Sequence, residues 1–193
     1  MCHNIVMEEK IIIWLQSFSN NFYDIFFQSV SYLVSWVGAI FVFLSILIFI
    51  NKKYALCMGL GYVISVGINY IIKVIVARPR PYVANSEIIN KLTTVGESFP
   101  SGHGLSVIFI VLSILALMHL LNKQGKFNLY NKTWFKVLCY IYAGLLIVLT
   151  MLARMYLGQH YLSDILVGLA LGGLCFTLSY FVYKKIASNN KKC

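Results

Sequence analysis

Five long apolar runs constrain this chain more than any other feature of its sequence. They cover roughly residues 31–50, 54–76, 104–121, 134–153 and 161–183. A helix needs about 20 mostly apolar residues to cross the hydrocarbon core of a bilayer, and helices satisfy their own backbone hydrogen bonds there. The runs therefore predict an all-α fold, a polytopic transmembrane helix bundle with five spans.

The composition agrees with lipid as the solvent for most of the surface. Hydrophobic residues make up 60% of the 193 residues and charged residues 11%, whereas soluble domains are about 45–50% apolar and about 25% charged. The five cysteines have an irregular spacing that fits neither a disulfide framework nor a metal knuckle. We expect those in the apolar runs to be buried free thiols.

The first 30 residues have a different pattern. Apolar residues recur every three or four positions at Ile11, Leu15, Phe18, Phe22 and Ile25, with polar residues between them. This is typical of an amphipathic helix in the membrane interface. A sixth span over residues 10–28 is the alternative, and Asp24 counts against it. We therefore expect an interfacial helix at 1–30, one membrane-embedded domain at 31–183 and a basic tail at 184–193.

Charged residues divide between the two sides of the predicted bundle. Ten of the sixteen basic residues, and no acid, fall on the side of the 51–53 turn, the 122–136 region and the tail. The positive-inside rule places this side in the cytoplasm of a cell (inner) membrane protein. Topology and anionic lipid then explain the net charge of +10, and dispersed lysines do not favour nucleic-acid binding. Glu8 and Glu9 stand where a signal peptide would be basic, so we expect none.

The first cluster of reactive residues lies on the opposite, extracytoplasmic side. Lys73 falls in the last turn of an apolar run, and Arg78 and Arg80 follow, each before a proline that disfavours helix. Three cations at one helix exit can bind an anion. A lysine snorkelling to the interface, with basic flanking residues, explains the same pattern equally well.

The second cluster stands directly before the third apolar run. Ser101 is placed to cap the helix, and Gly102 lets a ligand approach the backbone. The N-terminus of the helix then offers free N–H groups to an anion, with His103 as a proton donor at its mouth. An ordinary cap with an interfacial histidine is the alternative.

The third cluster joins the last two runs. His160 and Asp164 are four residues apart at the start of a helix and therefore share one face, with Arg154 shortly before them. A carboxylate behind an imidazole fixes its tautomer and stabilises the imidazolium. An ionisable residue in a span indicates a functional site, although a His–Asp pair that holds two helices together is the structural alternative. His119, at the other end of its helix, is interpreted as structural or interfacial.

Together these clusters resemble the signature of the type 2 phosphatidic acid phosphatase superfamily, which includes the lipid phosphate phosphatases. That signature is Lys-x6-Arg-Pro, then Pro-Ser-Gly-His, then Ser-Arg-x5-His-x3-Asp. Its parts match residues 73–81, 100–103 and 154–164 in order and spacing. One position departs, because Ala153 replaces the serine before the arginine. That replacement removes one hydrogen bond to phosphate, typically worth about 0.5–1.5 kcal/mol.

The resemblance implies a metal-independent lipid phosphatase without a cofactor, similar to bacterial undecaprenyl-diphosphatases and phosphatidylglycerophosphatase B. His160 would form a phosphohistidine, Asp164 would orient it, and His103 would protonate the leaving oxygen. The phosphate-binding groups would be Lys73, Arg80, Ser101, Gly102 and Arg154.

The motifs leave the substrate open among undecaprenyl pyrophosphate, phosphatidylglycerophosphate, phosphatidic acid and lipid A phosphate. We expect Arg78 to lie on a second phosphate, which favours a polyprenyl diphosphate or a broad range of lipid phosphates. A phosphotransferase with the same residues and a non-catalytic lipid-binding or transport protein remain the alternatives.

Small residues on the last run predict a close helix contact. Gly168 and Gly172 form a small-xxx-small pair, which permits close approach of another helix. The partner is a helix of the same chain or of a second protomer, so the sequence leaves monomer and homodimer open.

Overall fold

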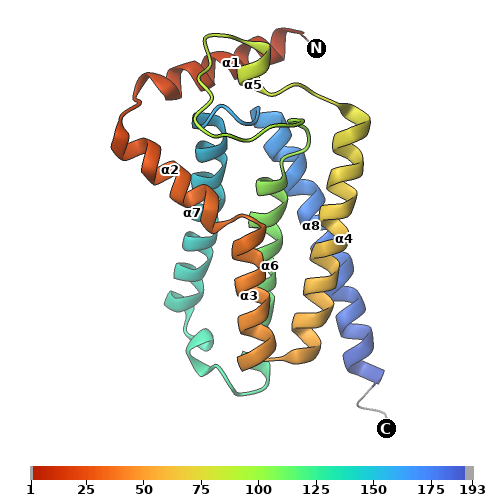
Figure 1. Ribbon diagram of the computed structural model, residues 1–193. Helices are drawn as coiled ribbons and strands as arrows, with labels where there is room; N and C mark the ends of the chain where they lie inside the picture. Colours follow the sequence, from red (N-terminus) through yellow and green to blue (C-terminus); the bar gives the residue numbers. More distant parts are fainter. Residues whose placement is uncertain (1, 190–193) are drawn as a thin grey trace.

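Long helices run side by side in the computed structural model, which describes residues 2–189, and the N-terminal helix lies across one end of the bundle (Figure 1). The helices are α1 (Cys2–Ser17), α2 (Asn21–Leu33), α3 (Trp36–Phe49), α4 (Lys52–Val76), α5 (Pro81–Ala84), α6 (Gly102–Lys123), α7 (Thr133–Tyr156) and α8 (Leu162–Asn189), with a short 3-10 helix η1 (Asn128–Asn131). The all-α membrane bundle expected from the sequence is confirmed.

The first predicted span is bent near its start, and its two helices together are apolar enough to cross a membrane. Residues 31–33 belong to α2, and α2 meets α3 at a bend of 46°. The break lies at Ser35, whose side chain accepts a hydrogen bond from the N–H of Val37 and caps α3. With 14 residues, α3 alone is about 21 Å long, which is short of the roughly 30 Å hydrocarbon core. The other four spans coincide with α4, α6, α7 and α8, which are long and apolar enough to cross a membrane.

The amphipathic segment is also two helices, where the sequence pattern predicts one. Asn20 separates them, because its side chain accepts a hydrogen bond of 2.9 Å from the N–H of Tyr23 and caps α2. Ile12 of α1 is fully buried against the cluster of Ile88, Met155, Tyr161 and Ile165. Phe22 and Ile25 of the predicted apolar face do not pack on the bundle, because both side chains are exposed.

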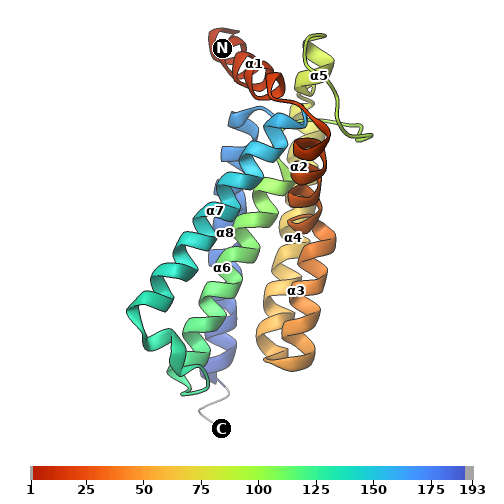
Figure 2. The ribbon, with the colours of Figure 1, turned by 90° about the vertical axis from the view of Figure 1, so that its left-hand side faces the viewer.

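Helix α1 lies across the end of the bundle and grips the long loop that follows α4 (Figure 2). The Gln16 amide donates to the carbonyls of Ile89 and Tyr156 at 2.8 and 2.9 Å, and its oxygen accepts from the N–H of Ile89 at 2.9 Å. Glu9 accepts from the Asn85 side chain at 3.1 Å. The N-terminal helix thereby fixes residues 85–89 of the loop.

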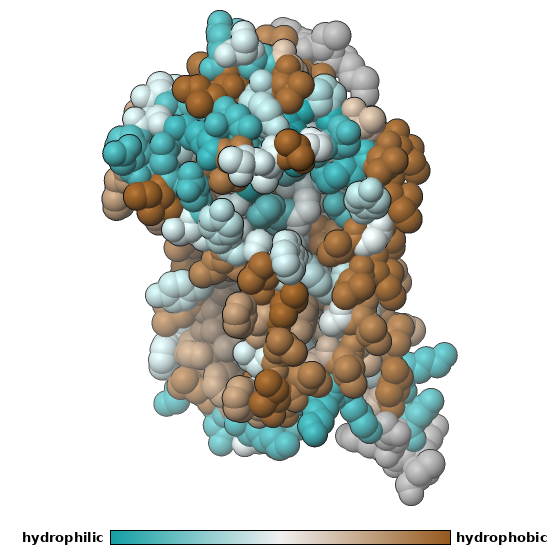
Figure 3. Space-filling model, viewed as in Figure 1, coloured by the Kyte–Doolittle hydropathy of each residue, from teal (hydrophilic) through white to brown (hydrophobic). Residues whose placement is uncertain are grey.

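The surface agrees with a multi-pass membrane protein. Hydrophobic residues cover the middle of the visible face, while hydrophilic residues gather at both ends (Figure 3). Many large apolar side chains of the long helices are exposed, such as Phe49, Ile75 and Phe181 at 81%, 76% and 70%. The lysines at the start of α4 and near the ends of α6 and α8 lie at the end opposite α1 (Figure 1). Residues 190–193 of the predicted tail lie outside the described residues.

Glycines on α6 and α8 let the two helices touch backbone to backbone. A Cβ atom on Gly168 would lie 2.3 Å from the carbonyl oxygen of Ser101, and one on Gly172 would lie 2.4 Å from that of Leu105. The small-xxx-small pair therefore packs on a helix of the same chain. Cys57, Cys139 and Cys175 are free thiols, as predicted, but only Cys175 is fully buried. The side chains of Cys2 and Cys193 lie outside the described residues.

Replacing Gly168 by alanine is expected to lower the stability of the protein by about 1–3 kcal/mol, the usual cost of overpacking. The added methyl group would have to displace the backbone at Ser101. Thermal unfolding in detergent measures the effect. The matched control is Gly173→Ala, since a Cβ there meets nothing within 4 Å. Equal melting temperatures for the two variants would contradict this prediction.

Candidate active site

Four segments meet beneath α1, at the end of the bundle opposite the start of α4: the end of α4, the start of α6, the α7–α8 loop and the start of α8. The chain leaves α4 at Ala77, which adopts a left-handed conformation (φ 48°, ψ 39°) and whose N–H donates to the carbonyl of Lys73. This left-handed cap ends the helix before the two Arg-Pro pairs. Arg78 and Arg80 are thus turned toward the end of the bundle.

The loop between α7 and α8 folds tightly over the end of α7. Gly158 has a φ of +72°, and a Cβ there would lie 2.7 Å from the carbonyl oxygen of Ile89. Only glycine combines that conformation with that contact at low cost. The N–H groups of Gln159 and His160 then donate to the carbonyl of Arg154 at 3.1 and 3.3 Å. His160 is therefore buried, with 2% of its surface exposed.

His160 and Asp164 lie together as the spacing predicts, but a serine stands beside them. The Nδ1 atom of His160 is 3.8 Å from Oδ2 of Asp164, an ion-pair distance that is too long for a hydrogen bond. The hydroxyl of Ser98 donates to Oδ2 of Asp164 and lies 3.5 Å from Nδ1 of His160. The backbone N–H of Tyr161 also donates to Oδ2, at 2.9 Å. The Nδ1 side of the ring thus faces the carboxylate, which leaves Nε2 for a ligand.

Cations surround this histidine. Burial, followed by the positive charges of Arg154, Arg80 and Lys73, lowers the pKa of His160 well below its ordinary value of 6.5. The imidazole is therefore neutral at neutral pH and has a free lone pair. A neutral imidazole inside a ring of cations can attack an electrophile whose oxygens are negatively charged.

Arg154 uses only part of its hydrogen-bond donors within the described part of the chain. The residue is 2% exposed, and its guanidinium donates to the hydroxyl of Ser31 on α2 at 2.5 Å. In the described part of the chain, its Nε atom is buried without a hydrogen-bond partner. A buried charged donor without a partner is costly, so the site favours an acceptor there, and an anion suits it best.

Lys73 and Arg80 are held by the loop before α6. The Lys73 ammonium donates to the carbonyls of Glu97 and Ser98 at 2.8 and 3.3 Å. The Arg80 guanidinium donates to the carbonyl of Gly96 at 2.8 Å and to the side chain of Gln159 at 2.6 Å. Backbone oxygens thus fix both cations within electrostatic range of His160.

The start of α6 completes the site. Ser101 is fully buried and caps the helix by accepting from the N–H of Gly104 at 3.3 Å. His103 follows in the first turn and lies within electrostatic range of His160. Together with Gly102, Asn69 and Trp36, it lines a cavity of about 150 Å³ between α3, α4 and α6. This cavity gives the first turn of α6 room for a small polar ligand.

Arg78 differs from the expectation that it binds a second phosphate, because it is engaged within the protein. Its guanidinium donates to Oδ1 of Asp164 at 2.6 Å and to the hydroxyl of Ser163 at 2.9 Å, and it lies 3.4 Å from Glu8. It also stacks over the ring of Tyr161 at 4.0 Å. Two carboxylates and an aromatic face occupy this cation, so it is not free for a second phosphate.

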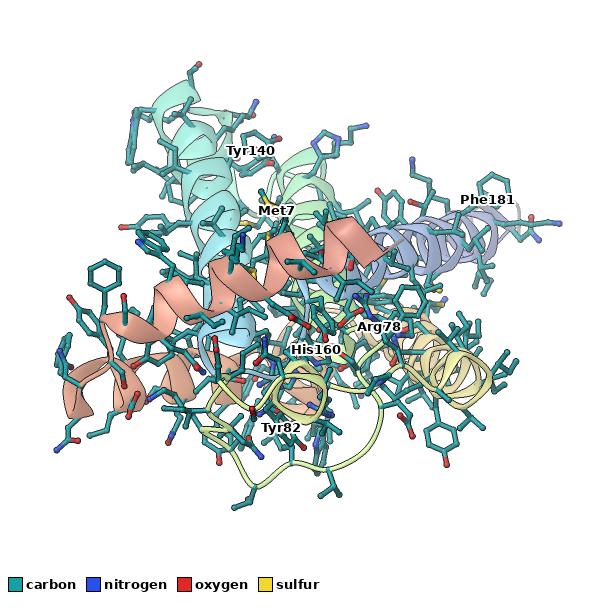
Figure 4. All side chains as sticks on the ribbon, turned by 90° about the horizontal axis from the view of Figure 1, so that it is seen from above. Met7, Arg78, Tyr82, Tyr140, His160 and Phe181 are labelled. Carbon is teal, nitrogen blue, oxygen red and sulfur yellow. The ribbon has the colours of Figure 1, made fainter. Side chains whose placement is uncertain are left out.

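The structure brings together all the other residues expected from the motifs: Lys73, Arg80, Ser101, Gly102, His103, Arg154, His160 and Asp164. Sequence reasoning missed Glu8, Ser31, Ser98 and Gln159. Their contacts join positions 61–155 residues apart, where no local pattern signals them. Seen from above, His160 and Arg78 lie near the centre, between α1 and the short helix α5, which carries Tyr82 (Figure 4). Among the described residues, no three histidine, cysteine or acidic side chains gather as metal ligands.

Comparison with known proteins places these features in a wider group. A family model described as the PAP2 superfamily matches residues 52–187. Phosphatidylglycerophosphatase B of Bacillus subtilis (strain 168) is 36% identical over 85 residues, which is 42% of this chain and only 36% of the length of that relative.

Two solved structures share the fold. The crystal structure of a transmembrane PAP2 type phosphatidylglycerolphosphate phosphatase from Bacillus subtilis has a TM-score of 0.73 at 22% identity, over 94% of this chain and 86% of that one. LpxE of Aquifex aeolicus has a TM-score of 0.67 at 21% identity, over 89% and 93%.

Proposed function

Because this chain belongs to the PAP2 superfamily, we propose that it is a membrane lipid phosphatase that removes a phosphomonoester head group through a phosphohistidine intermediate. The observation that carries the proposal is the setting of His160: a buried, neutral imidazole with a carboxylate beside Nδ1 and three cations within electrostatic range. The family relationship supplies the reaction class, and the names of the relatives point to lipid phosphates.

Two steps account for the chemistry. In the first, Nε2 of His160 attacks phosphorus, the bond from phosphorus to the lipid oxygen breaks, and that oxygen takes a proton from the imidazolium form of His103, which the negative charge of the bound phosphate stabilises. In the second, a water molecule attacks phosphorus and gives a proton to His103, the phosphorus–nitrogen bond breaks, and phosphate leaves. Asp164 stabilises the positive charge that develops on the His160 ring.

The cations and the start of α6 would stabilise the charge on the phosphoryl group. Arg154, Lys73 and Arg80 neutralise its oxygens, and Ser101 and Gly102 present the N-terminus of the helix to it. Such preorganised groups usually supply the largest part of the catalysis.

A phosphomonoester is the substrate class that these residues favour. The reason for expecting a diphosphate was a free Arg78, and that guanidinium is engaged by Asp164 and Glu8. The positive-inside rule would place the site on the extracytoplasmic face, because the lysines at the start of α4 and near the ends of α6 and α8 lie at the other end of the bundle. A head group at that surface would reach the site while its tails stay in the bilayer.

Phosphate release by the detergent-purified protein tests the proposal. The panel contains phosphatidylglycerophosphate, phosphatidic acid, a lipid A phosphate and undecaprenyl pyrophosphate, each with and without EDTA. We expect release from the monoesters in the presence of EDTA, and a trapped phosphoprotein that is labile to acid and stable to alkali. No release from any lipid would refute the phosphatase. Transfer of phosphate to an added alcohol but not to water would favour a phosphotransferase.

A further inference from the structure

Helix α1 places a carboxylate at the edge of the active site. Oε1 of Glu8 accepts from the backbone N–H of Ser163 at 2.7 Å, and Oε2 accepts from the Ser163 hydroxyl at 3.0 Å. Ser163 lies in the first turn of α8, so Glu8 satisfies donors that the helix leaves free. A negative charge at this end of the helix is favourable.

The same carboxylate is the outer member of a chain of alternating charges. Oε2 of Glu8 lies 3.4 Å from the guanidinium of Arg78, and that guanidinium lies 2.6 Å from Oδ1 of Asp164. The other oxygen of Asp164 is 3.8 Å from Nδ1 of His160. Asp164 is fully buried, while the Glu8 and Arg78 side chains are only 14% and 18% exposed. Partly buried charges interact more strongly than charges in water.

We infer that Glu8 and Arg78 are positioning residues for the reaction at His160, which they influence through Asp164. Arg78 fixes one oxygen of Asp164, so that the other faces the imidazole. Glu8 holds Arg78 and offsets its positive charge. This inference rests on the proposed function, and it assigns a role in the site to the N-terminal helix.

Charge gives the two residues opposite effects on His160. The charged or titratable groups that act on this ring are Asp164, Arg154, Arg80, Lys73 and His103. Removing the negative charge of Glu8 leaves Arg78 uncompensated, which disfavours the imidazolium and lowers the pKa of His160. Removing the positive charge of Arg78 leaves the negative charge of Asp164 uncompensated, which favours the imidazolium and raises the pKa of His160. A residue that merely held the fold together would not produce shifts of opposite sign.

The test compares Glu8→Gln, Arg78→Gln and Arg78→Lys by the pH dependence of phosphate release from phosphatidic acid in mixed micelles. Glutamine at position 8 keeps an oxygen for the Ser163 N–H, but it removes the charge and the acceptor that faces the Ser163 hydroxyl and Arg78. We expect each glutamine variant to lower kcat about 10–100-fold, the usual effect of losing a group that orients an active-site residue, with KM nearly unchanged. The acid limb should move to lower pH in Glu8→Gln and to higher pH in Arg78→Gln. Arg78→Lys should keep the wild-type limb.

Two matched controls separate this effect from the docking of α1 and from surface charge. Glu9→Gln alters the next residue of the same helix, which binds Asn85 and Tyr161. Glu87→Gln removes an exposed acid from the neighbouring loop. Both variants should keep the kcat of the wild type and the acid limb of its pH–rate profile. Equal shifts in Glu8→Gln and Glu9→Gln, or shifts of the same sign in the two glutamine variants, would overturn the inference.

A second readout does not depend on turnover. Vanadate mimics phosphate, and its binding to the full-length protein can be followed by thermal stabilisation at several pH values. The acid limit of vanadate binding should shift in the same opposite directions as the rate. An inactive wild type that binds vanadate with these shifts would refute the proposed phosphatase and keep the positioning role. An active wild type with unshifted variants would refute the positioning role alone.

Discussion

His160→Ala is expected to lower the rate of phosphate release by a factor on the order of 10⁵ or more, as loss of a nucleophile does in other hydrolases. The variant has no atom that can form the covalent intermediate, whereas the cations that bind phosphate remain. Release is measured with phosphatidic acid, and the labelled phosphoprotein should vanish as well. Substrate affinity should change little, because Arg154, Arg80 and Lys73 are untouched.

The control for this variant is His119→Ala. His119 is exposed near the far end of α6, where its ring packs against Tyr130. We expect normal release from this protein. Activity that survives in His160→Ala would show that another group attacks phosphorus.

The same histidine sets a pH dependence with a defined sign. Its pKa in the folded protein lies below 6.5 because of burial and the nearby cations. Between that lowered value and 6.5, the unfolded chain binds more protons than the folded chain, so stability falls as the pH falls through this window. The rate should hold down to a lower pH than an ordinary histidine would allow, because His160 stays unprotonated there. A rate profile with its acid limb at or above 6.5 would contradict this.

Arg154→Met is expected to lower the rate by about 10²–10³-fold, the usual cost of removing one donor to a developing negative charge. Methionine fills much of the same space but offers nothing to the phosphate oxygens. The melting temperature should stay the same or rise, because an apolar side chain replaces a buried charge whose Nε atom has no partner among residues 2–189. Phosphate release tests the predicted loss of rate, and thermal unfolding of the same variant tests the predicted melting temperature.

Ser31→Ala serves as the comparison for Arg154. It removes the 2.5 Å hydrogen bond to the guanidinium but keeps the charge. We expect a loss of about tenfold or less, in line with one hydrogen bond. A larger loss in Ser31→Ala than in Arg154→Met would mean that α2, and not the cation, is the important element.

The sequence predicts the long helices well, because a bilayer imposes a length and a hydropathy that four runs satisfy plainly. It fails where short-range polar contacts decide. The first run contains no charged residue, yet a serine cap at Ser35 breaks it, while Ser31 on α2 binds Arg154. The spacing of His160 and Asp164 predicts their proximity, since one helical turn relates them. It cannot reveal Ser98, which arrives from a loop more than 60 residues away.

The hydrogen bonds between Gln16 and Ile89 also determine which segments can be exchanged between members of the family. Carbonyls of the loop before α6 hold Lys73 and Arg80, and the same loop is clasped by α1 through Gln16. The loop is therefore not an independent cassette that could be transplanted to alter head-group preference. A functional chimera would have to carry the first 17 residues along with the loop. Helix α1 and this loop are separated by three helices in the sequence, but they have to be exchanged together because they pack as one structural unit.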